Sequence, residues 1–209
     1  MTELNHSKNW SADLIRATRG HRVLIVPGLR NSDDRHWQSL WHKQIPNSSR
    51  IELDNWEIAD LEKWRNAIKK SLNEINEPVV LIAHSFGALA SASIAAEFPK
   101  KIVAVLLVAP ADPDKFGIRS KLPQRLLQVP VKIIASDDDP WISDAKAAFL
   151  ALLWGADFLR IKQLGHINSD SNIGFWAEGI NELRQLVRKA LRLNSIKFGA
   201  ENREHHYAA

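Results

Sequence analysis

The chemistry in this chain begins with the pentapeptide AHSFG at 83–87, which follows an apolar run at 79–82. A serine between two small residues at the end of a strand can occupy the sharp strand-to-helix turn that exposes a nucleophilic hydroxyl. Ser85 has Ala83 two places before it and Gly87 two places after it, although glycine usually holds the first of these positions. An ordinary strand end fits the same residues, so the pentapeptide alone does not decide.

A serine hydroxyl is a weak nucleophile, so a general base and a group that orients this base must lie elsewhere in the chain. In α/β hydrolases these residues follow in the order serine, acid and histidine, each after a different strand. The sequence DDDPW at 137–141 comes directly after the apolar run 131–136, and His166 comes after the stretch 157–162. We therefore expect Ser85, one of these aspartates and His166 to form a catalytic triad.

Three consecutive aspartates, residues 137–139, compete for the role of the acid. Asp139 precedes Pro140, which favours an extended backbone and a rigid loop suited to holding an imidazole in one tautomer. We expect Asp139 to be the acid, with Asp138 as the second choice. A metal site is disfavoured, because consecutive side chains point apart and no carboxylate-rich spacing follows.

The transition state of acyl transfer carries a developing oxyanion that needs backbone N–H donors. One donor is expected at Phe86, directly after the nucleophile, and the other at Leu29 in the loop PGLRNSDD after the first strand. Gly28 would allow this loop to approach the site, although a plain Pro-Gly turn also fits. The candidates for lining a substrate pocket are Trp141, Asn168 and Ser32.

The sequence gives no catalytic role to the other histidines. His84 is adjacent to the nucleophile, but neighbouring side chains on a sharp turn diverge, so His84 is expected to support the turn by packing. No acidic partner is indicated for three further histidines, which are expected at the surface or in loops: His21, His36 and His42.

Apolar, β-branched runs alternate with segments of helical periodicity along most of the chain. Strands are predicted at 22–26, 49–53, 78–83, 102–109, 131–136 and 157–162, and helices at 37–41, 60–76, 87–98, 143–153 and 176–191. This alternation predicts an α/β fold of three layers, with a mostly parallel sheet and helices on both faces. In such sheets ligands bind at the carboxyl ends of the strands, where the three triad residues are expected.

A length of 209 residues with 45% hydrophobic and 25% charged residues is ordinary for one globular domain. The absence of cysteine excludes disulfides and a cysteine nucleophile and agrees with a cytoplasmic location. No apolar run reaches the roughly 18 residues of a membrane span, and the polar N-terminus has no signal-peptide core. No cofactor and no metal are expected.

The net charge of +4 arises at the end of the chain, where six Lys and Arg and two Asp and Glu lie from Arg184 onward. A basic last helix is the simplest interpretation, and no basic groove for nucleic acid is indicated. The domain is expected to span residues 21–193. An N-terminal extension at 1–20 precedes it, and a tail at 194–209, a candidate for disorder, follows it.

Four motifs together resemble the small α/β hydrolases related to retinoblastoma-binding protein nine. They are VPGLRNSDDRHW at 26–37, AHSFG at 83–87, SDDDPW at 136–141 and GHINSDSNIGFWAEG at 165–179. The resemblance covers about residues 22–191 and is most specific where GHIN leads into GFWAEG. It implies an α/β-hydrolase fold with a minimal cap domain or none, and it implies that Ser85, Asp139 and His166 are the triad.

These residues predict a serine hydrolase that cleaves a small carboxylic ester or amide through an acyl-enzyme. The expected partner is this small-molecule substrate, with no nucleic acid and no membrane. The alternative is a protein-interaction module on the hydrolase fold with little or no turnover, because a fold does not fix a function. Truncation after Leu193 separates the two hypotheses, since loss of a captured partner with unchanged hydrolysis would favour binding.

Overall fold

Six strands form one sheet in the computed structural model, which describes the backbone of residues 2–207 and the side chains of residues 10–195. The strands are β1 (Arg22–Val26), β2 (Ser48–Arg50), β3 (Val79–His84), β4 (Ile102–Val108), β5 (Val131–Ser136) and β6 (Asp157–Ile161). Their order across the sheet is β2-β1-β3-β4-β5-β6, and all neighbours are parallel. The carboxyl ends of the strands therefore meet at one end of the sheet.

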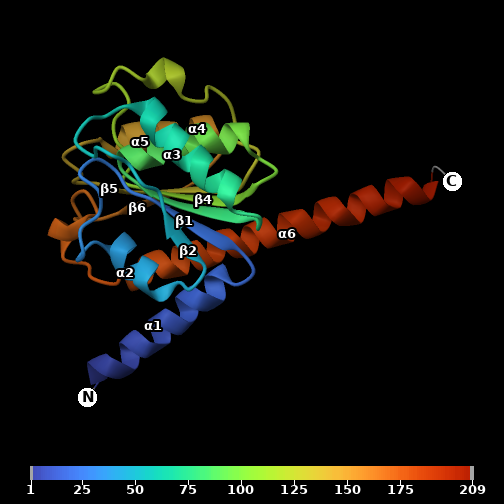
Figure 1. Ribbon diagram of the computed structural model, residues 1–209, viewed down its shortest axis with the longest axis horizontal. Helices are drawn as coiled ribbons and strands as arrows, with labels where there is room; N and C mark the ends of the chain where they lie inside the picture. Colours follow the sequence, from blue (N-terminus) through green and yellow to red (C-terminus); the bar gives the residue numbers. More distant parts are fainter. Residues whose placement is uncertain (1, 208–209) are drawn as a thin grey trace.

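Helices cover both faces of this sheet (Figure 1). Their bounds are α1 (Thr2–Thr18), α2 (Trp37–Gln44), α3 (Leu61–Glu74), α4 (Phe86–Glu97), α5 (Asp144–Trp154) and α6 (Ala177–Tyr207). One core lies under α3, α4 and α5, and a second core lies under α1, α2 and α6. Successive residues of a strand serve opposite cores, as Leu81 and Ile82 do in β3. The three-layer α/β architecture predicted from the sequence is confirmed.

The central strands are buried on both faces, which explains why their sequences lack polar alternation. All six residues of β3 and all six of β5 are buried, whereas the outer strands β2 and β6 keep partly exposed residues. β2 is shorter than the predicted strand at 49–53, because pairing with β1 ends at Arg50. Removal of these apolar side chains from water is the main favourable contribution to folding.

The connection from β4 to β5 is short and forms one wall of the carboxyl end of the sheet. Within the described residues it contains a single 3₁₀ turn, η1 (Arg119–Lys121), and no inserted domain. Hydrogen bonds hold it close to the sheet, including one from the Ala111 N–H to the Ser85 carbonyl of 3.1 Å. The expectation of a minimal cap or none therefore agrees with this connection.

The two ends of the chain differ from the sequence-based expectation. The segment 1–20 was predicted as an extension, yet α1 packs against α6 and α2, and Leu14 is fully buried between them. The few apolar residues of this segment make its periodicity weak. At the other end α6 continues as a helix to Tyr207, where the sequence predicted a tail that is a candidate for disorder. The side chains of 196–209 lie outside the described residues.

Candidate active site

Ser85 occupies the turn between β3 and α4, at the carboxyl end of the central strands. Its φ of 54° and ψ of −123° lie in a region that residues other than glycine rarely adopt. The Ser85 N–H donates to the Val108 carbonyl at 3.0 Å, and the Ser85 carbonyl accepts from the N–H groups of Ala88 and Ala111. Strained backbone persists where its surroundings over-determine it, and these three hydrogen bonds do so here.

Two glycines allow the loop after β1 to pack directly against this turn. A Cβ atom on Gly28 would lie 2.6 Å from the Ser85 Cβ, and one on Gly87 would lie 2.3 Å from the Pro27 carbonyl oxygen. Neither position has room for a side chain. Ala83 instead lies within β3, paired with β1 and β4, so this position needs no glycine backbone.

Three polar side chains from separate segments form a continuous hydrogen-bonded chain. The Ser85 Oγ lies 2.9 Å from His166 Nε2, and His166 Nδ1 lies 2.9 Å from Asp139 Oδ2. The Asp139 carboxylate is fully buried, and its Oδ1 also accepts the Trp141 N–H at 2.9 Å. Because Asp139 accepts at Nδ1, the neutral imidazole carries its proton there and presents the Nε2 lone pair to the serine hydroxyl.

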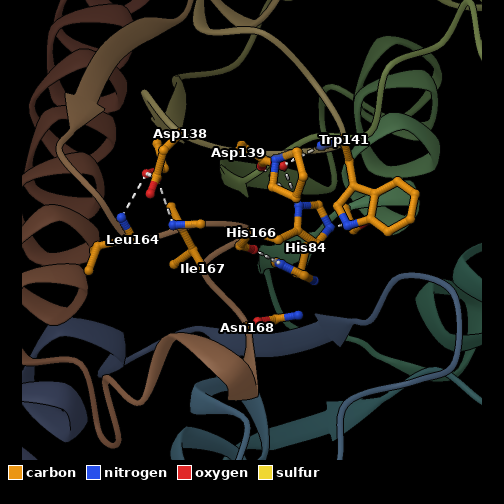
Figure 2. Close-up of polar contacts among 12 residues, drawn as sticks. His84, Asp138, Asp139, Trp141, Leu164, His166, Ile167 and Asn168 are labelled. Carbon is orange, nitrogen blue, oxygen red and sulfur yellow. Dashed lines mark hydrogen bonds and ion pairs between the residues drawn. The ribbon is translucent and has the colours of Figure 1, made fainter.

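All three consecutive aspartates bind the loop that carries His166, each at a different point. Asp137 Oδ1 accepts the Gln163 N–H at 2.9 Å, and Asp138 Oδ1 accepts the Gly165 N–H at 2.8 Å. A hydrogen bond from Ser136 Oγ lowers the pKa of Asp138 and keeps it anionic. Figure 2 shows Asp139 beside His166, His84 and Trp141, whereas Asp138 lies apart from them toward Leu164. The structure therefore brings Asp139, and not Asp138, to the imidazole.

The two expected oxyanion donors belong to the two segments that meet at Ser85. Phe86 is the first residue of α4, and the N–H groups of a first helical turn have no acceptor within the helix. Leu29 follows Gly28, the residue that packs on the turn, and it lines the pocket in front of Ser85. The positive end of the α4 dipole also lies at this site and favours negative charge.

A pocket of about 540 Å³ opens in front of the serine. Its lining includes four apolar or aromatic residues, Leu29, Ala111, Phe116 and Trp141. It also includes the polar residues Asp33, Asn168, Ser169 and Asp170, and Lys115, whose ammonium group lies over the Trp141 ring. Two of the three residues expected to line a pocket, Trp141 and Asn168, are therefore at this pocket, and the Trp141 side chain is more than half exposed.

Ser32, the third expected pocket residue, is buried below the site and is not among the residues that line the pocket. Its hydroxyl donates to Gln38 Oε1 at 2.8 Å, and the Gln38 amide donates to the carbonyls of Ile82 and Val26 at the ends of β3 and β1. Ser32 thus supports the strand ends through Gln38. The apolar pattern of α2 did not indicate that this glutamine is buried.

The histidines near the site are more buried than the sequence predicts. His36 was expected at the surface or in a loop, but it is 3% exposed and lines the pocket. Burial lowers the pKa of His36 to about 4. His21 is also buried rather than at the surface, whereas His42 is only partly buried. His84 packs beside the turn, as expected, and burial lowers its pKa well below the usual value.

Asp33 joins the loop after β1 to the loop that carries His166. Its Oδ1 accepts the Ser169 hydroxyl at 2.8 Å and the N–H groups of Arg35 and His36. The hydrogen bond from Ser169 is the main cause of a lowered pKa for this carboxyl group. Asp33 therefore contributes a negative charge to the lining of the pocket.

The described residues give no support for a metal site or for a membrane-spanning helix. Among them, no group of three or more His, Cys, Asp or Glu side chains is arranged to hold a metal ion. In the same part of the chain, no helix has the length and apolar character to span a membrane.

Solved structures of YdeN-like hydrolases share this architecture. A YdeN-like hydrolase of Pectobacterium atrosepticum is 36% identical over 87% of this chain and 98% of that one, with a TM-score of 0.82. The ydeN gene product of Bacillus subtilis is 19% identical over 79% of this chain and 98% of its own, with a TM-score of 0.67. A search of curated proteins finds no match.

A more distant structure shares the fold at low identity. Est1E of Butyrivibrio proteoclasticus is 12% identical over 84% of this chain and 90% of its own, with a TM-score of 0.62. Another structure of Est1E has ferulic acid bound. The family model described as serine hydrolase matches residues 23–185, which include all three residues of the hydrogen-bonded chain. The chain has an α/β-hydrolase fold and belongs to this serine hydrolase family, whose members include the YdeN-like hydrolases.

Proposed function

We propose that the protein is an esterase or amidase that cleaves a small carboxylic ester or amide by nucleophilic catalysis at Ser85. The observation that carries this proposal is the hydrogen-bonded chain from Ser85 through His166 to Asp139 on a strained turn at the pocket floor. Membership of the serine hydrolase family supports it.

In the proposed reaction His166 Nε2 removes the Ser85 hydroxyl proton as Oγ bonds to the substrate carbonyl carbon. The carbonyl π electrons move to oxygen, and the N–H groups of Phe86 and Leu29 stabilise the resulting oxyanion. Asp139 stabilises the imidazolium, which then donates its proton to the departing alcohol or amine. A water molecule repeats the sequence on the acyl-enzyme and restores Ser85.

The pocket suggests the size and character of the substrate. A volume of about 540 Å³ falls in the range of small-molecule sites. The pocket lining contains Leu29, Phe116 and Trp141, which suit an apolar or aromatic group, and polar residues that suit a polar group. We infer that the substrate is small and carries both kinds of group.

The test combines turnover with labelling of the nucleophile. The purified chain should hydrolyse nitrophenyl acetate or butyrate and should react with a fluorophosphonate, with the label located on Ser85 by peptide mass spectrometry. Ser85→Ala should abolish both, whereas Ser91→Ala, which changes a buried serine within α4, should preserve them. Folded wild-type protein that neither reacts with the probe nor turns over any ester or amide would overturn the proposal.

A further inference from the structure

Two buried imidazoles, packed against each other, lie next to the Ser85–His166 pair, and the proposed reaction does not use either of them. His84 is the last residue of β3, and His36 precedes α2; they are 5% and 3% exposed. Their ring centroids are 4.8 Å apart at an interplanar angle of 69°. The His84 ring is also 4.8 Å from the His166 ring. The base therefore has a second histidine in contact with it.

The hydrogen-bond partners assign the tautomers of both rings. His36 Nδ1 accepts the Gln38 N–H at 3.1 Å, so the neutral ring carries its proton on Nε2. His84 Nε2 lies 2.9 Å from the backbone carbonyl of His166, and a carbonyl can only accept, so this nitrogen is the donor. Through this bond His84 holds the backbone of the base itself.

The backbone that His84 holds is strained. The φ angles of Gly165 and Ile167, on either side of His166, are 51° and 48°. A positive φ at a β-branched residue is an outlier, and Ile167 is fully buried as well. Such a conformation requires contacts that fix it. Trp37 Nε1 donates to the Ile167 carbonyl at 2.9 Å, and Asp138 accepts the Gly165 N–H. The bond from His84 fixes the residue between these two.

We propose that His84 is a positioning residue for the catalytic base, acting through the hydrogen bond from its Nε2 to the His166 carbonyl, with the packed rings of His36 and Trp37 holding its orientation. Ring contacts from both residues to His84 support this arrangement. The inference rests on the proposed function only in its kinetic consequence. Its structural content, one imidazole setting the position of another, can be measured without turnover.

The charge of His84 matters as much as its hydrogen bond. The titratable side chains packed against it are His36 and His166, and the charged groups that act on His36 in turn are Asp33 and Arg50. Burial lowers the pKa of both His84 and His36. His84 therefore remains neutral while His166 gains and loses its proton, and it adds no positive charge next to the imidazolium that forms during catalysis.

The kinetic test uses His84→Gln and His84→Met, two unbranched side chains of similar length. Glutamine retains an N–H donor that can reach the His166 carbonyl, and methionine does not. Displacement of a reacting group by about 1 Å can cost about 100-fold in rate, so His84→Met should lower kcat by about that factor with little change in KM. His84→Gln should recover most of the loss. Rates are expressed per active site by fluorophosphonate titration, so that misfolded protein does not count.

The spectroscopic test follows the imidazoles of ¹⁵N-histidine-labelled protein by nuclear magnetic resonance. In the wild type and in His84→Gln, the His166 Nδ1–H bonded to Asp139 should give a downfield proton signal, and this signal should shift or broaden in His84→Met. The His84 ring should remain neutral from about pH 5 to 8. If His84→Met does not fold, His84→Leu replaces it as the variant without a donor.

The outcomes separate the two proposals. The positioning role would be overturned by wild-type kcat per active site in His84→Met. Equal losses of kcat in the methionine and glutamine variants would also overturn it, as would titration of His84 near pH 6.5. An inactive wild type overturns the proposed function instead, and the downfield signal then decides the positioning role by itself.

Discussion

The serine turn and the histidine loop reach their geometry by different physical means. At the turn, small residues allow two backbone segments to touch: Cβ atoms on Gly28 and Gly87 would lie within 2.6 Å of neighbouring atoms. In the histidine loop, a Cβ on Gly165 would meet no atom within 4 Å, and hydrogen bonds with distant residues fix the backbone, which donates to Asp138 and accepts from His84 and Trp37. Backbone hydrogen bonds fix both regions, but the position of Ser85 also depends on steric exclusion, whereas hydrogen bonds with distant side chains position the loop of His166.

This difference determines how each region should respond to substitution. No space is available at the turn for an added methyl group, so a single carbon atom there should lower both the unfolding free energy and the rate of the reaction. A lost hydrogen bond at the loop leaves other bonds in place, so its effect should depend on which atom of the loop was held. Asp139 differs from Asp138, His84 and Trp37 because it binds the imidazole ring of His166 and not the loop backbone.

The largest effect is expected from Asp139→Asn. Asparagine can present an N–H to His166 Nδ1 and favour the wrong tautomer, and it removes the charge that stabilises the imidazolium, so kcat should fall by about 10⁴-fold. The measurement is ester hydrolysis per folded protein, with folding checked by circular dichroism. Asp138→Asn is the matched control: it weakens a bond to the Gly165 N–H and should cost about tenfold or less. A larger loss in the control would contradict the assignment of Asp139 as the acid.

The next effect is expected from Gly87→Ala. The new Cβ would lie 2.3 Å from a backbone oxygen, so the loop after β1 must move away from Ser85. We expect a loss of about 3 kcal/mol in unfolding free energy and a fall of about 100-fold in kcat. Urea denaturation and ester hydrolysis measure the two.

Gly117→Ala is the control for this methyl group. Gly117 has a positive φ but no atom within 4 Å of the added Cβ, so the cost should be about 1 kcal/mol of backbone strain, with kcat unchanged. Normal kcat in Gly87→Ala would show that the turn tolerates displacement of the loop.

The same contrast explains what could be predicted from the sequence. Ser85, Asp139 and His166 could be placed because each follows a predicted strand within a few residues, and the carboxyl ends of parallel strands meet. The hydrogen bonds that hold the loop could not, because Trp37 and Ile167 are 130 residues apart. Only the folded sheet brings such residues together.

His36 illustrates the same limit more sharply. It was expected at the surface or in a loop because no acidic partner was evident, yet it is buried beside His84, and its backbone N–H donates to Asp33. Within residues 10–195 its Nε2 has no hydrogen-bond partner. A polar residue buried by the packing of other segments gives no periodic signal in its own sequence. The packing of α1 on α6 was not predicted for a related reason. The sequence of one helix does not show which other helix packs against its apolar face.

A third prediction concerns the pH dependence of stability. The pKa of His36 is about 4 in the folded protein and about 6.5 when unfolded, so between these values the unfolded chain binds more protons. The stabilisation is complete above pH 6.5 and is lost as the pH falls toward 4, by about 3 kcal/mol in total. His84 should add to the loss in the same direction.

Replacement of His36 by asparagine isolates its share of this effect. Asparagine can still accept the Gln38 N–H at the start of α2 but cannot be protonated. Urea denaturation of both proteins at about pH 7.5 and 4.5 should show a smaller loss of unfolding free energy in His36→Asn. Equal losses would mean that His36 is already protonated in the folded protein at the lower pH.

The smallest effect is expected where the sequence departs from the usual motif, at Ala83. Introducing the usual glycine, Ala83→Gly, adds backbone freedom to a central strand and should cost about 0.5–1 kcal/mol in unfolding free energy. Ala83 pairs with Val26 and Leu107 in register, so its methyl group does not set the position of Ser85, and kcat should remain at the wild-type level. A marked rise in kcat would mean that the alanine strains the turn. If kcat is unchanged in Ala83→Gly and falls strongly in Gly87→Ala, the position of Ser85 depends on the residues packed against the loop after β1.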